Sequence, residues 1–186
     1  FESFDESLID QKENTLIYVG RLDADKNVGE LIDIVNEINL KDFKFKIIGD
    51  GPSKNELENK VKSIEVLNDK ILFLGSQTIS EIFQELSKSK IFLFTSKTEC
   101  LPTVLIEANL TANALISYNC KYGPSDIVNE KNGFLIPMND KQFFKEKLQY
   151  LIDYEEDLEL LNKLSGKNSG KWRKDLIINQ WNSLIE

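Results

Sequence analysis

The residues with the clearest chemical potential are two carboxylates, Glu99 and Glu107, on either side of a predicted helix start. The apolar run at 91–94 before them is typical of a buried strand, and Pro102 and Thr103 favour the first turn of a helix. A loop that leads from a strand into a helix N-terminus is where open α/β sheets bind anionic ligands. We therefore predict Glu99 in such a loop and Glu107 inside the helix that follows.

Composition limits the chemistry that this site can perform. The chain of 186 residues contains no histidine, which excludes from it Ser-His-Asp centres, Cys-His centres and histidine-ligated metals. Its net charge of −8 argues against binding to nucleic acid or to an anionic membrane. Cys100 and Cys120 have no metal-ligand or disulfide-framework spacing, and no apolar run approaches the roughly 18 residues of a membrane span. We expect a reduced, cytoplasmic location.

Apolar runs and helical patterns alternate about six times along the chain. This alternation predicts an α/β fold with a doubly wound, mostly parallel, six-stranded Rossmann-like sheet and a helical C-terminal tail. We assign residues 1–14 to a linker or edge, 15–152 to the sheet domain and 153–186 to C-terminal helices. The predicted strands are 15–19, 43–48, 71–74, 91–94, 114–117 and 134–136.

Several local signals predict where helices begin and end. Asn27 is a candidate cap for a helix, and Ser53 with Glu56 fits a capping box. The stretch 166–170, with a glycine at each end, is expected to interrupt the tail. A last helix is expected to carry Trp172, Ile177, Trp181 and Leu184.

The carboxyl ends of the predicted strands collect residues suited to a phosphate ligand. Gly20 and Gly51 let a ligand approach the backbone, while Arg21 and Lys26 are cations on the same rim. Glu107 lies among apolar residues, so it needs a partner, which a backbone amide or a lysine can also supply. Each feature alone has an ordinary explanation as a turn glycine, a surface charge or a loop acid. The Rossmann dinucleotide and P-loop glycine spacings are both absent.

Residues 16–151 resemble the C-terminal, donor-binding half of retaining GT-B glycosyltransferases of family 4, the glycosyl transferases group 1. The pair Glu99 and Glu107 matches the E-x7-E motif of that family. That motif is common by chance, but several further motifs follow in the order of the family, and together they are specific. They are YVGRL at 18–22, KN at 26–27, IGDGP at 48–52, FLG at 73–75, SKTECLPTVLIEA at 96–108, GP at 123–124 and NGFL at 132–135.

The resemblance implies a nucleotide-diphospho-sugar site that uses no metal or other cofactor. In the family, the residue matching Glu99 faces the donor sugar and the one matching Glu107 accepts hydrogen bonds from the ribose. The residues matching Arg21 and Lys26 bind the diphosphate leaving group, and the segment around Leu74 lies beside the base. The backbone that faces the phosphates or the sugar hydroxyls corresponds to Leu101, Pro102, Thr103 and Val104.

The chain departs from the family at Cys100, where a glycine is usual. If this position requires a positive φ or a close backbone approach to the sugar, cysteine there is unfavourable.

The resemblance also implies a separate N-terminal domain that holds a glycan or lipid-linked acceptor. This chain would then begin at the inter-domain linker, and its last helices would pack toward that domain. We expect the fragment alone to bind the donor weakly and to transfer no sugar. Peripheral membrane association is expected only of the full-length protein. A non-catalytic nucleotide-sugar module and a GT-B-like sugar epimerase remain the alternatives.

Overall fold

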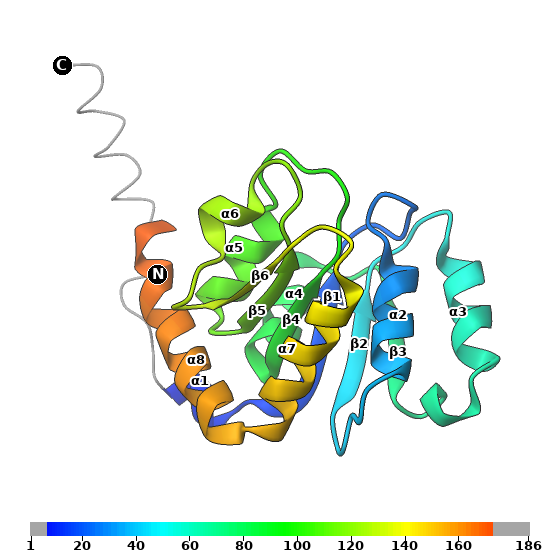
Figure 1. Cartoon of the computed structure of the whole chain (residues 1–186), viewed down its shortest axis with the longest axis horizontal. Coiled ribbons are helices and arrows are strands. Elements are labelled where there is room, and N and C mark those ends of the chain that lie inside the picture. The colour runs from blue at the N-terminus through cyan, green and yellow to red at the C-terminus, as the bar shows by residue number, and fades with distance from the viewer. Residues whose placement is uncertain (1–6, 173–186) are drawn as a thin grey trace.

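A single six-stranded sheet organises residues 7–172, the part of the chain that the computed structural model describes (Figure 1). The strands lie in the order β3-β2-β1-β4-β5-β6, and each pair of neighbours is parallel. Their bounds are Glu13–Val19 for β1, Lys44–Ile48 for β2, Ile71–Gly75 for β3, Ser89–Phe94 for β4, Ala114–Tyr118 for β5 and Gly133–Ile136 for β6.

Helices cover both faces of this sheet. On one face, α2, α3 and α7 bury their apolar side chains in one core cluster, and α4, α5 and α6 do so in a second cluster on the other face. The predicted doubly wound α/β fold is therefore confirmed. The helices are α1 Ser7–Asp10, α2 Val28–Asn36, α3 Lys54–Lys62, η1 Glu65–Leu67, α4 Ile79–Lys88, α5 Thr103–Leu110, α6 Pro124–Ile127, α7 Lys141–Asp153, α8 Glu155–Asn168 and η2 Ser169–Trp172.

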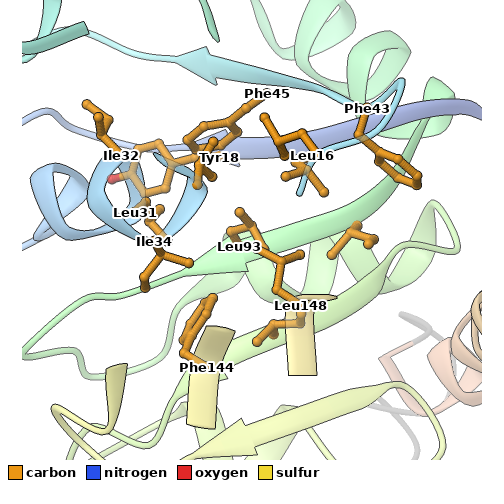
Figure 2. Close-up of a cluster of buried hydrophobic side chains, with 14 of the residues drawn as sticks. Leu16, Tyr18, Leu31, Ile32, Ile34, Phe43, Phe45, Leu93, Phe144 and Leu148 are labelled. Atoms are coloured by element: carbon orange, nitrogen blue, oxygen red, sulfur yellow. The ribbon is translucent and has the colours of Figure 1, made fainter. Parts of the chain in front are cut away.

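The strands are buried on both faces because successive side chains of a strand point to opposite sides. In β1, Leu16 and Tyr18 belong to the first core cluster, whereas Ile17 and Val19 belong to the second. Figure 2 shows Leu16 and Tyr18 in the first cluster together with Phe144 of α7. This double burial explains why the strands read as continuous apolar runs in the sequence.

The strand order reverses between β1 and β4. From β1 the chain proceeds outward through β2 to β3, and it then returns to place β4 on the other side of β1. The loops that follow β1 and β4 therefore diverge, one toward α2 and the other toward α5. Such a switch point opens a crevice at the carboxyl ends of the two strands, where ligands of α/β proteins bind.

Two predicted helix caps are wrong. Asn27 precedes α2, but its backbone is left-handed (φ 55°) and its side chain caps no amide. Ser53 precedes α3 with a backbone that is already helical (φ −87°, ψ −3°), so it forms no capping box with Glu56. A capping side chain needs an extended backbone. Thr78 has one (φ −70°, ψ 160°), and it forms a capping box with Glu81 at the start of α4.

The two ends of the described chain also differ from the sequence pattern. The stretch 1–14, assigned to a linker or edge, contains α1 and the beginning of β1 at Glu13. The interruption predicted at 166–170 begins later than its first glycine, because α8 runs through Gly166 and ends at Asn168, and the 3-10 helix η2 follows from Ser169. Ser165 fastens this part of α8 by donating from Oγ to Oδ1 of Asn109 at 2.9 Å. The positions 177, 181 and 184 of the predicted last helix lie outside the described residues.

Candidate functional site

A pocket of about 250 Å³ lies at the switch point. Its walls come from the end of β1, the loop into α2, the end of β4, the loop before α5 and the first turns of α5. Eight of the site residues predicted from the sequence line this pocket. The complete lining is Tyr18, Val19, Gly20, Lys26, Phe94, Glu99, Leu101, Pro102, Thr103, Val104 and Glu107. The geometry thus gathers residues far apart in the sequence into one concave site.

An ion pair between Lys26 and Glu99 crosses this pocket. Nζ of Lys26 donates to Oε1 of Glu99 at 2.5 Å, and the two side chains are only 25% and 13% exposed. The pair joins the loop after β1 to the loop after β4. It places a cation and a carboxylate in direct contact inside a site that is largely shielded from solvent.

Backbone contacts hold these two loops in register. Oδ1 of Asp23 accepts hydrogen bonds from the amides of Asp25 and Lys26, both at 3.1 Å. The amide of Lys97 donates to the carbonyl of Asp25 at 2.8 Å. The hydroxyl of Thr95 donates to the carbonyl of Lys26 at 3.1 Å. The position of the Lys26 backbone is therefore set by both loops.

The first turns of α5 supply backbone amide donors and a carboxylate to the pocket. Pro102 stands at the N-cap position without a side-chain cap, and the amides of a first helical turn have no acceptor within the helix. The macrodipole adds partial positive charge at this end. Glu107 lies in the next turn, half-buried in the pocket wall, and burial raises the pKa of its carboxyl. The site thus combines anion-binding amides with an acceptor carboxylate.

Three predicted site residues do not line this pocket. Arg21 lies on the rim with its side chain 69% exposed, and its Nε pairs with Oδ2 of Asp23 at 3.2 Å. Gly51 packs against the backbone of Leu22, where an added Cβ would lie 2.3 Å from the carbonyl oxygen. Leu74 at the end of β3 packs against the second core cluster.

Three wall residues were missed by the sequence reasoning, namely Tyr18, Val19 and Phe94. Their apolar strand pattern marked them only as core. Tyr18 is the one with a detectable signal, because a phenol in such a run needs a polar partner. Its hydroxyl donates to the carbonyl of Arg21 at 2.9 Å, and burial raises the pKa of the phenol.

Cys100 is accommodated without the strain that the sequence suggested. Its side chain is exposed. Among the described residues, the non-glycine positions with positive φ are Asn27, Lys41, Ala112 and Asn139, so the backbone at Cys100 is not left-handed.

The family model for glycosyl transferases group 1 matches residues 1–168. The chain belongs to this family. It is 32% identical over 175 residues to the amylovoran biosynthesis glycosyltransferase AmsD of Erwinia amylovora, covering 94% of this chain and 49% of that protein. It is 34% identical over 158 residues to an undecaprenol-PP-glycan alpha-1,4-N-acetyl-D-galactosaminyltransferase of Campylobacter jejuni, covering 82% of this chain and 42% of that one.

Solved structures of glycosyltransferases share the fold. The pneumococcal O-GlcNAc transferase GtfA, in complex with UDP and GlcNAc, superposes with a TM-score of 0.84 at 24% identity, covering 100% of this chain and 38% of that one. The lipopolysaccharide outer core galactosyltransferase WaaB gives a TM-score of 0.82 at 23% identity, with 92% and 48% covered. The chain therefore spans about half the length of the curated relatives, or less. No helix within residues 7–172 is long and apolar enough to cross a membrane.

Proposed function

We propose that this chain is the C-terminal, donor-binding domain of a retaining, metal-independent glycosyltransferase of family 4. The observation that carries the proposal is the convergence of Lys26, Glu99 and Glu107 with the N-terminus of α5 in one pocket at the switch point. The cation and the free amides of this set suit the diphosphate of a nucleotide sugar, and its two carboxylates suit the hydroxyl groups of the sugar and the ribose.

The diphosphate of the donor is placed at the first turn of α5. The amides of Thr103 and Val104 face it there, and the ammonium of Lys26 provides the positive charge. Arg21 reaches it from the rim, where its exposed guanidinium is free to turn inward once it leaves Asp23. As the bond to the sugar breaks, negative charge grows on the departing phosphate, and these groups stabilise it.

The two carboxylates accept hydrogen bonds from the two parts of the donor that carry hydroxyl groups, the ribose and the sugar. Glu107 accepts from the ribose hydroxyls, and this interaction also supplies the partner that a half-buried acid needs. Glu99 accepts from hydroxyls of the sugar beside the reacting carbon. The base extends past Gly20 toward the end of β3, where Leu74 lies.

Sugar transfer requires an acceptor site, which we assign to a second domain of the full-length protein. The acceptor is proposed to be a glycan, free or lipid-linked, because relatives are named for amylovoran biosynthesis and for transfer to an undecaprenol-PP-linked glycan. This chain alone is expected to bind the donor and to transfer no sugar.

Calorimetric titration with UDP-, GDP-, ADP- and CMP-sugars tests the proposal. One nucleotide class is expected to bind, and Lys26→Gln is expected to weaken its binding by about tenfold or more. Lys46→Gln is the matched control, because Lys46 also pairs closely with a glutamate (2.6 Å to Glu85) but lies outside the pocket. Failure of every sugar nucleotide to bind at millimolar concentration would contradict the donor-site assignment.

The full-length protein separates an enzyme from a non-catalytic binding module. In it, Glu99→Gln is expected to abolish measured sugar transfer while donor binding persists. Unchanged transfer would show that Glu99 has no catalytic part.

A further inference from the structure

The pocket's positive side chain is already neutralised when no ligand is bound. Among the lining residues in the described part of the chain, Lys26 carries the only positive charge. Its ammonium contacts the carboxylate of Glu99 at 2.5 Å, and both side chains are mostly shielded from water. A phosphate that enters must therefore compete with Glu99 for this ammonium.

When a ligand draws Lys26 away from Glu99, the cost in free energy depends on which hydrogen-bond donors the ligand brings to Glu99. A carboxylate that loses its cation in a shielded site remains unsatisfied unless new donors reach it. The phosphate itself adds negative charge beside it. An intact nucleotide sugar supplies hydroxyl donors from its sugar, whereas a nucleoside diphosphate supplies none at that position.

We propose that the Lys26–Glu99 pair is the element that makes this pocket prefer an intact nucleotide sugar over the free nucleoside diphosphate. This inference rests on the proposed donor site and adds a specificity role to it. Before transfer, the phosphate holds Lys26 and the sugar hydroxyls satisfy Glu99. After transfer the sugar has left, Glu99 lacks a partner, and its return to Lys26 displaces the diphosphate product.

Removal of the carboxylate should accordingly strengthen the binding of a bare diphosphate. Inorganic diphosphate is the first probe, because it engages Lys26 and the amides of α5 without any base or sugar. At low ionic strength, Glu99→Gln is expected to bind it about three- to tenfold more tightly than the unaltered chain. Glu99→Ala is expected to act in the same direction.

Glu85→Gln is the matched control for the change in net charge. Glu85 pairs with Lys46 at 2.6 Å, and the two side chains are 23% and 14% exposed, so the pair is similar in closeness and burial. It lies outside the pocket lining. Its loss is expected to leave diphosphate affinity within about twofold.

The discrimination itself is measured with UDP and UDP-N-acetylglucosamine, or with whichever pair the titration panel selects. The ratio of their Kd values is expected to favour the sugar nucleotide in the unaltered chain and to shrink in Glu99→Gln. Equal ratios, or diphosphate binding that is unchanged or weaker in both Glu99 variants, would overturn the inference while leaving the donor site intact. Absence of all nucleotide binding in the unaltered chain would instead overturn the proposed function. Thermal melting confirms that each variant is folded.

Discussion

Gly123 packs directly on Pro102, the residue that precedes α5. A Cβ added at Gly123 would lie 2.4 Å from Cδ of Pro102 and 2.9 Å from the carbonyl oxygen of Cys100. The backbone of Gly123 also has φ 91°, a conformation that side chains rarely adopt. The loop after β5 thereby supports the loop that forms one wall of the pocket.

Gly123→Ala is predicted to damage both stability and ligand binding. The added methyl group meets a ring and a backbone carbonyl and also strains φ, so a loss of about 1–3 kcal/mol in the free energy of unfolding is expected. The displaced segment 100–102 is expected to weaken nucleotide binding as well. Chemical denaturation and calorimetry measure the two effects. Gly170→Ala is the control, because a Cβ there meets nothing within 4 Å.

Asp23 is predicted to position the loop that carries Lys26. Its Oδ1 accepts from the amides of Asp25 and Lys26, and its Oδ2 pairs with Arg21. Asp23→Ala removes the acceptor of the two amides, so it is expected to reduce nucleotide affinity about tenfold with little change in melting temperature. Asp23→Asn keeps the Oδ1 acceptor for the amides, so it is expected to retain most of the affinity. Equal losses in the two variants would show that the amide contacts do not matter.

The sequence predicts the sheet well because the strands are buried on both faces. The apolar run at 91–94 predicts β4, and the alternation of strands with helices predicts that neighbouring strands are parallel. The two carboxylates of the site are likewise detectable, since Glu99 follows a strand and Glu107 lies in the next helix. These features depend on residues close together in the chain.

Features that depend on packing between distant segments could not be predicted from the sequence. The supporting contact of Gly123 with Pro102 and the ion pair of Lys26 with Glu99 both join segments that the fold alone brings together. The helix caps failed for a local reason of a different kind. Ser53 has the residue type of a cap but not the backbone conformation, which is set by how the chain leaves β2.

The capping box at Thr78 gives a prediction that separates stability from function. Oγ1 of Thr78 accepts from the amide of Glu81 at 3.3 Å, and the side chain of Glu81 accepts in return from the amide of Thr78 at 2.7 Å. Thr78→Ala is expected to lower the free energy of unfolding by about 1 kcal/mol and to leave nucleotide affinity unchanged. Ser53→Ala, at a helix start without a side-chain cap bond, is expected to cost about half of that or less.

Glu107 is predicted to cost stability at neutral pH because burial raises the pKa of its carboxyl. A raised pKa means that the folded state holds the proton more tightly than the unfolded state. Stability is therefore lost as the pH rises above the ordinary carboxyl value of about 4.3, and it is regained when Glu107 is protonated. Glu107→Gln removes this dependence and is expected to melt at a higher temperature at pH 7.

The gain from Glu107→Gln is expected to shrink toward pH 4, where the carboxyl is mostly protonated in the folded and in the unfolded state. Nucleotide affinity should fall in the same variant, since an amide is a weaker acceptor for the ribose hydroxyls than a carboxylate. Thermal melting at pH 4 and pH 7, with calorimetry at pH 7, measures both. Glu159→Gln makes the same charge change at an exposed position of α8 and serves as the control. A Glu107→Gln effect that is identical at the two pH values would exclude the ionised carboxylate as its cause.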